Sequence, residues 1–168
     1  IDGITVLTNS KVEKITERGI LINGQNIDVE KIIVCVGRKP NINSDELKKL
    51  GIEFNSKGIN VNKKMLTSVS NIYAIGDITG KYELAHVASK QGEVTAHNIM
   101  GHGNEMDYGV IPFCVFTFPE VSFVGDCSGK SGEFPLRANA KANCLGDTRG
   151  FLKVFEKNGI CVGAIIIG

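Results

Sequence analysis

An apolar stretch that runs straight into a Gly-Asp pair constrains this chain most. Residues 71–75 read Asn-Ile-Tyr-Ala-Ile and predict a buried strand, which Gly76 and Asp77 follow directly. In an open α/β sheet, ligands bind at the edge where the strands have their carboxyl ends. Gly76 lets a ligand approach the backbone, and the Asp77 carboxylate can accept hydrogen bonds from sugar-like hydroxyls. The alternative is a plain turn in which Asp77 only caps a helix.

A helix is predicted soon after this pair, over residues 84–100, with Gly101 closing it. Its amino end would present unpaired N–H groups and a partial positive charge, which stabilise an anionic or electron-rich ligand. One narrow face of the helix carries only small side chains, so we expect something large to approach it closely. These small residues are Ala85, Ala88, Gly92 and Ala96.

The chain before this centre predicts mainly strands. A continuous apolar run over residues 32–36 is typical of a strand covered on both faces, and it ends at Gly37. A short surface helix is expected to follow, with Ser44 as its cap and Gly51 as its left-handed stop. Before residue 32, a β-meander is predicted from short strands over residues 4–7, 11–16, 19–22 and 25–29, with a tight Asn23-Gly24 turn.

The pattern returns to strands from residue 108. An Asn-Gly pair within residues 156–159 predicts a hairpin between the last two strands. The fold class is therefore α/β, with α+β character in the C-terminal part, and with seams near residues 38 and 108. The strands are expected over residues 111–116, 121–124, 151–155 and 160–167.

Charge, hydropathy and cysteine content exclude several function classes. Nineteen basic and eighteen acidic residues leave a net charge of +1 without charged blocks, which argues against a nucleic-acid partner. No apolar run approaches the roughly 20 residues that span a membrane. The five cysteines are odd in number and never spaced C-x-x-C, so they indicate free thiols beside apolar segments in a cytoplasmic, reducing compartment. Neither a metal site nor a disulfide framework is expected.

Three segments closely resemble, in order and spacing, successive motifs of the pyridine nucleotide-disulfide oxidoreductases: residues 36–41, 67–77 and 84–92. The pattern Ala-His-x-Ala-Ser-x-x-Gly at 85–92 is similar to the dihydrolipoamide dehydrogenase branch of that family. Residues 112–125 and 145–151 resemble its interface domain. The resemblance implies a fragment of a FAD/NAD-binding Rossmann-like fold followed by the start of an antiparallel dimerisation domain. The implied domains are the end of the NAD-binding domain (1–38), the second half of the FAD-binding domain (39–107) and the N-terminal part of the interface domain (108–168).

The resemblance also implies two cofactors, FAD and NAD, and the residues that contact them. Asp77, after Gly76, would bind the ribityl chain of the flavin, and the backbone of Glu83, Leu84, Ala85 and His86 would contact the pyrimidine edge of its ring. Reduced flavin is electron-rich at that edge, which suits the amino end of a helix. Gly37 resembles the glycine that lets the nicotinamide dinucleotide approach, and Val12 would line its adenosine side. No residue is assigned a catalytic role, the three histidines included.

Parts of the family's catalytic apparatus are missing. The sequence contains no G-x-G-x-x-G, no closely spaced cysteine pair for a redox disulfide, and no His with a Glu partner as acid/base pair. We therefore expect an internal fragment with two cut ends, inactive by itself. In the intact enzyme, the resemblance implies oxidation of dihydrolipoamide with FAD and NAD. Residues 126–133 form a shorter segment than in relatives; a deletion, an engineered change and omitted residues would each explain this.

The partners implied by the resemblance are a second copy, bound through the interface domain, and the lipoyl-bearing subunits of 2-oxo acid dehydrogenase complexes. Two alternatives stay open. One is another flavoprotein of the same family, such as an NADH oxidase or a mercuric or glutathione-type reductase. The other is a non-catalytic dimerisation module.

Overall fold

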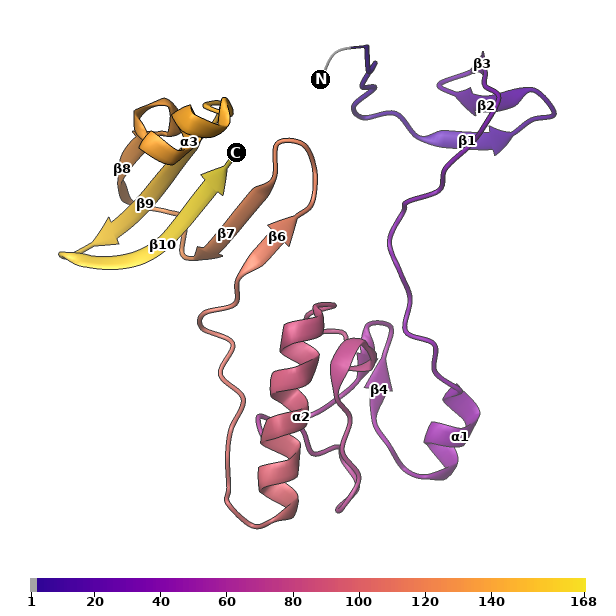
Figure 1. Ribbon diagram of the computed structural model, residues 1–168. Helices are drawn as coiled ribbons and strands as arrows, with labels where there is room; N and C mark the ends of the chain where they lie inside the picture. Colours follow the sequence, from indigo (N-terminus) through magenta and orange to yellow (C-terminus); the bar gives the residue numbers. More distant parts are fainter. Residues whose placement is uncertain (1–2) are drawn as a thin grey trace. The chain divides into compact units, whose positions relative to one another are not determined.

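The chain folds as two compact units, Ile1–Arg38 and Lys39–Gly168 (Figure 1). The computed structural model describes residues 3–168. Every named sheet of this part of the chain is antiparallel. Among residues 3–168, no helix combines the length and the apolar character needed to cross a bilayer.

The first unit is a three-stranded meander in the order β1-β2-β3. Asn23 and Gly24 connect its last two strands with φ angles of 50° and 76°. Two residues with positive φ are what a tight hairpin turn demands, so this predicted turn is confirmed. The strands are β1 (Val12–Ile15), β2 (Gly19–Ile22) and β3 (Gln25–Asp28).

Two strands predicted in this unit do not form, over residues 4–7 and 32–36. Ile33 and Val36 are 86% and 89% exposed, the opposite of the burial we expected. A strand needs a neighbour to complete its hydrogen bonds, and nothing among residues 3–168 pairs with either segment. The prediction was wrong because an apolar run shows what a strand would bury, not that its neighbours are present.

The second unit begins with α1 (Ser44–Lys49). The predicted cap is wrong by one residue: Asn43, not Ser44, accepts hydrogen bonds from the N–H groups of Asp45 and Glu46, at 3.2 and 3.3 Å. Gly51 follows the helix with φ of 70°, as expected for its stop. A small hairpin then joins β4 (Phe54–Asn55) to β5 (Gly58–Ile59).

The segment over residues 71–75 is not the strand that was predicted: it starts in a turn at Asn71, which has φ of 67°. It makes one isolated bridge, between Leu66 and Tyr73, and the N–H of Ala74 donates to the carbonyl of Met65 at 3.1 Å. It leads into a single 3₁₀ turn, η1 (Gly76–Thr79), and then into α2 (Ala85–Ile99). The predicted helix is confirmed, and Gly101 follows it with φ of 84°.

A small apolar core holds α2 in place. Val87 and Val94 on its inner face pack with buried side chains from before and after the helix: Met65, Met106 and Ile111. A second cluster, of Ile52, Ile59 and Ala74, includes the β5 residue Ile59, and Phe54 of β4 packs against it. Segments that flank α2 in sequence therefore pack against its inner face.

The C-terminal part is a five-stranded sheet in the order β6-β7-β10-β9-β8 (Figure 1). The predicted hairpin between its last two strands turns at Asn158 and Gly159, with φ of 56° and 80°. Strand β8 and helix α3 were not predicted. The elements are β6 (Phe113–Val115), β7 (Val121–Gly125), β8 (Lys130–Pro135), η2 (Leu136–Ala138), α3 (Ala140–Leu145), β9 (Phe151–Lys157) and β10 (Ile160–Ile167).

The five cysteines are all free thiols. Four of them are exposed, and Cys127 is half-buried. Cys35 is exposed because the unpaired run over residues 32–36 is itself exposed.

Candidate functional site

The Gly-Asp pair forms the start of η1, where Gly76 has φ of 76°. The hydroxyl of Thr79 donates to the carbonyl of Gly76 at 2.9 Å, and the N–H of Gly80 donates to the carbonyl of Asp77 at 2.9 Å. These two bonds close the turn on itself, and the Asp77 side chain remains exposed. A carboxylate in that position can accept hydrogen bonds from an incoming ligand.

The small-residue face of α2 is the surface on which this turn rests. A Cβ added at Gly76 would lie 3.5 Å from the Cβ of Ala88, and one added at Gly92 would lie 3.6 Å from Cδ1 of Ile75. The expected close approach is therefore confirmed for Ala88 and Gly92, and the neighbour is the chain's own 75–76 segment. Ala85 and Ala96, at the two ends of the face, stay exposed.

The buried side-chain amide of Gln91 binds the turn at Gly76. Gln91 is fully buried, and its Oε1 accepts the N–H of Gly76 at 2.6 Å. Sequence reasoning missed Gln91, although it occupies an inward position of α2 between Val87 and Val94. A large polar residue at an apolar position of a helix is the signal that could have found it, because such a side chain needs a buried partner.

The amino end of α2 is suited to an electron-rich ligand. Leu84 precedes the helix in an extended conformation and its side chain makes no capping hydrogen bond, and the first turn holds no acidic residue. The first intrahelical bond runs from the N–H of Ala88 to the carbonyl of Leu84, so the preceding N–H groups belong to the unpaired set of a helix start. Ala85 and His86 are exposed there, as is Glu83 just before the helix. The predicted residues Gly76, Asp77 and 83–86 are thus gathered around the first turns of α2.

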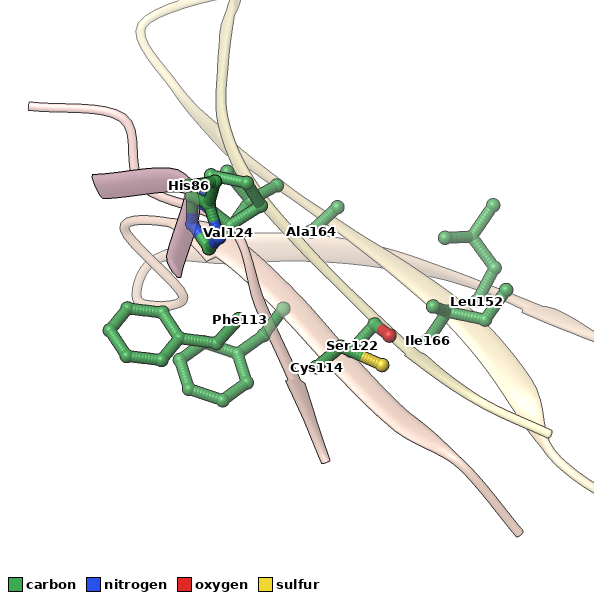
Figure 2. A pocket seen from close by; sticks show the side chains of 10 residues that line it. His86, Phe113, Cys114, Ser122, Val124, Leu152, Ala164 and Ile166 are labelled. Carbon is green, nitrogen blue, oxygen red and sulfur yellow. The ribbon is translucent and has the colours of Figure 1, made fainter. Parts of the chain in front are cut away.

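His86 lies at an apolar pocket of about 360 Å³ on the sheet (Figure 2). His86 comes from α2, and the floor comes from one row of paired strand residues: Cys114 opposite Ser122, Ser122 opposite Ile166, and Ile166 opposite Leu152. No carboxylate lines this pocket. The pocket therefore offers mainly a surface for apolar packing.

Gly37 and Val12 belong to the first unit. Gly37 has φ of 98°, and a Cβ built there would have no heavy atom within 4 Å, so the backbone at this point is open to a ligand. Val12 starts β1 opposite Ile22 and is 51% exposed. The remaining histidines, His97 and His102, contact each other edge to face near the end of α2, with ring centroids 5.3 Å apart. Within residues 3–168 there is no group of three or more His, Cys, Asp or Glu side chains that could hold a metal ion.

One protein-family model matches a part of the chain that contains all of the predicted site residues. The family described as "Pyridine nucleotide-disulphide oxidoreductase" matches residues 2–92. Among curated proteins, the chain is 40% identical over 182 residues to a dihydrolipoyl dehydrogenase of Chlamydia muridarum, covering 99% of this chain and 39% of that protein. It is 39% identical over 186 residues to a dihydrolipoyl dehydrogenase of Geobacillus stearothermophilus, covering 99% of this chain and 40% of that protein.

Solved structures give the same picture of the fold. LpdA from Mycobacterium tuberculosis matches with a TM-score of 0.88 and 25% identity over 99% of this chain and 40% of that one. The flavoprotein disulfide reductase RclA from Escherichia coli matches with a TM-score of 0.81 and 25% identity, over 95% of this chain and 41% of that one. The expected fold class, mixed α/β with an antiparallel sheet in the C-terminal part, is confirmed. The chain spans about two fifths of the length of these relatives.

Proposed function

This chain belongs to the pyridine nucleotide-disulphide oxidoreductase family, and we propose that it supplies the flavin-contacting centre of a dihydrolipoamide dehydrogenase. The proposal assigns residues 39–107 to the second half of a FAD-binding domain, residues 1–38 to the end of an NAD-binding domain, and residues 108–168 to the start of an interface domain. The compartment we propose is the cytoplasm.

One observation carries this proposal: the exposed Asp77 directly follows Gly76, which packs on Ala88 near the start of α2, and Leu84 at that helix start makes no side-chain cap. Contact between Gly76 and Ala88 sets the turn against α2 one helical turn from its start. A ligand that fits this arrangement presents hydroxyl donors to a carboxylate and an electron-rich edge to a helix amino end. The ribityl chain and the pyrimidine edge of a flavin have these two properties, so the residues present fit FAD.

Each residue then has a defined task. Asp77 accepts hydrogen bonds from the ribityl hydroxyls, and the backbone around Ala85 and His86 donates to the oxygen and nitrogen atoms of the ring edge. The positive end of α2 stabilises negative charge at that edge, which raises the affinity for the reduced form. Bound FAD supplies two-electron transfer between a redox disulfide and a nicotinamide nucleotide.

The NAD contacts that we propose are Gly37 and Val12. The open backbone at Gly37 supports a dinucleotide approach, because no side chain stands in the way. Val12 offers an exposed apolar surface of the kind that packs on an adenosine.

A second copy of the chain is the partner that we propose for residues 108–168. This part of the chain carries exposed apolar side chains that a soluble surface seldom leaves uncovered: Phe116 at 84% and Phe118 at 78% in the connection from β6 to β7, and Ile160 at 67% in β10. This observation also favours the alternative of a non-catalytic dimerisation module. The lipoyl-bearing subunits of a 2-oxo acid dehydrogenase complex remain a proposal from the resemblance to dihydrolipoamide dehydrogenase. Flavin absorbance and solution mass, measured on the purified chain, separate the two readings.

Chain 1–168 alone is expected to lack lipoamide-dependent NADH production. The redox disulfide and the His-Glu pair are not in its sequence, and these groups perform the substrate's thiol chemistry. The measurement is NADH absorbance with dihydrolipoamide and NAD present. Turnover at a rate typical of enzymes would refute this expectation.

The decisive variant is Asp77→Ala in the full-length flavoprotein that carries this chain. Removing a charged acceptor of hydroxyl hydrogen bonds costs about 1.5–3 kcal/mol, so FAD should bind roughly ten- to a hundredfold more weakly. The protein as purified should lose its yellow colour, and FAD titration by fluorescence gives the affinity.

Asp45→Ala is the matched control, because Asp45 is an exposed carboxylate in the first turn of α1. It should retain FAD. If Asp77→Ala retains FAD to the same extent as Asp45→Ala, Asp77 is only a turn residue and the proposed contact is wrong.

A further inference from the structure

Gln91 is the most completely buried polar side chain of α2, with an exposed fraction of 0%. Val87 and Val94 on either side of it are apolar and also buried. Burying an amide without partners costs stability, so a glutamine in this position has to be explained by the groups that it binds. Both ends of its amide are in fact bound.

The direction of each bond follows from the chemistry of the partners. The N–H of Gly76 can only donate, so it must face Oε1 of Gln91, at 2.6 Å. Nε2 of Gln91 therefore donates to the hydroxyl oxygen of Tyr108, at 3.0 Å. The Tyr108 hydroxyl keeps its own proton for Sδ of Met65, at 3.7 Å. One amide orientation satisfies the whole chain of bonds.

Both backbone polar groups of Gly76, its N–H and its carbonyl, are hydrogen-bonded to side chains. Gln91 accepts its N–H, and Thr79 donates to its carbonyl at 2.9 Å. Both side chains are buried, Thr79 being 7% exposed. Gly76 also has φ of 76°, so the direction in which the chain leaves toward Asp77 depends on a backbone conformation that these two bonds fix.

Tyr108 is itself held by ring contacts. Its ring stacks on Tyr82 with centroids 5.5 Å apart, and Nζ of Lys81 lies 4.9 Å from its centroid. Tyr108 lies in the segment that leads from α2 to β6. Through Gln91, this segment is joined to the turn that carries Asp77.

We infer that Gln91 is a positioning residue for the flavin contact: it fixes the Gly76 peptide so that the Asp77 carboxylate stays at the amino end of α2, while Tyr108 holds the amide of Gln91 in orientation. The inference rests on the proposed flavin contact of Asp77. Gln91 itself touches no cofactor in this scheme.

Two variants distinguish the hydrogen bonding of the Gln91 side chain from its size and shape. Gln91→Met keeps the length of the side chain but removes both the acceptor and the donor. Gln91→Glu keeps an acceptor for the N–H of Gly76 and can accept from Tyr108, whose hydroxyl proton turns toward it. Lys90→Ala is the control, because Lys90 is an exposed neighbour on the same helix and pairs with Glu93 at 3.0 Å.

The first measurement is made on chain 1–168 by NMR of backbone amides. In Gln91→Glu, the Gly76 amide shift should gain a pH titration step from the introduced carboxyl, a step absent in the wild type and in Lys90→Ala. In Gln91→Met, hydrogen exchange at Gly76 should rise by roughly tenfold or more. A Gly76 amide without a titration step in Gln91→Glu overturns the inference, even if Gln91→Met does not fold.

The second measurement is FAD affinity in the full-length flavoprotein. We expect binding about tenfold weaker in Gln91→Met, rescue to within about threefold of wild type in Gln91→Glu, and no change in Lys90→Ala. Unchanged affinity in Gln91→Met beside a loss in Asp77→Ala overturns the positioning role alone. Unchanged affinity in Asp77→Ala overturns the proposed function instead, whatever the amide signals show.

Discussion

Gly80→Ala tests whether the β4–β5 hairpin packs against the end of η1 as closely as the structure shows. A Cβ built at Gly80 would lie 2.1 Å from the carbonyl oxygen and 2.6 Å from the carbonyl carbon of Lys57. Both atoms are backbone, so the obstacle cannot swing aside as a side chain would. Gly80 also has φ of 65°, where any Cβ is strained.

Gly51→Ala separates the cost of the left-handed backbone conformation from the cost of the clash with Lys57. Gly51 has φ of 70°, nearly that of Gly80, but a Cβ there would meet only Cγ2 of Val69, at 3.9 Å. The left-handed conformation costs about 1–2 kcal/mol for a residue with a Cβ, and Gly51→Ala should lose that amount. Gly80→Ala must in addition move two backbone segments apart by about 1 Å, for which overpacking suggests a further 1–3 kcal/mol, about 2–5 kcal/mol in all.

Urea unfolding followed by tyrosine fluorescence measures the difference. All three tyrosines, Tyr73, Tyr82 and Tyr108, lie in the unit Lys39–Gly168, and the chain has no tryptophan, so the signal reports on this unit. With a urea m-value of about 1–3 kcal/mol/M, the extra loss in Gly80→Ala should lower its midpoint by roughly 1 M below that of Gly51→Ala. Equal midpoints for the two variants would show that the hairpin does not approach residue 80 in solution, and the reasoning would fail.

Two further predictions concern acid stability and the core. The pKa of the Asp126 carboxyl falls from 3.8 to about 2, first because Lys157 hydrogen-bonds to it and then because Ser128 does. The folded state thus binds the proton less readily than the unfolded state, so the stability that this carboxylate contributes is complete above pH 4 and is lost as the pH falls toward 2. Thermal unfolding measured across that range should show a smaller loss of stability in Lys157→Met than in wild type. Equal slopes of stability against pH in the two proteins would contradict the ion pair. Met65→Ala should lower the free energy of unfolding by about 2–5 kcal/mol, because Met65 is fully buried in the core around α2, and a loss below about 1 kcal/mol would place it outside that core.

Much of the candidate site could be predicted from local sequence, because its signals are local. Gly76 and Asp77 were found from their place after an apolar segment, and the helix over residues 85–99 from its periodicity and from the glycine that follows it. Gln91 was not found. Its role depends on a hydrogen bond to a residue fifteen positions away and on another to Tyr108, seventeen positions away, which no local pattern reports.

The fold shows the same division between local and long-range causes. Strand β8 has no β-branched residue, and it forms because β9 lies beside it, with Gly132 opposite Val154 and Phe134 opposite Leu152. The run over residues 32–36 is the opposite case. Its composition favours a strand strongly, but it stays unpaired because residues 3–168 supply no neighbour for it.

The sequence by itself determined the two Asn-Gly hairpin turns, the extent of α2 and the resemblance to a family, because each depends on residues close together along the chain. Only the tertiary structure decided that Gly76 rests on Ala88, that Gln91 is buried beneath it, and which strands pair. These depend on free energies of burial and hydrogen bonding between distant segments, and such partners exist only once the chain has folded.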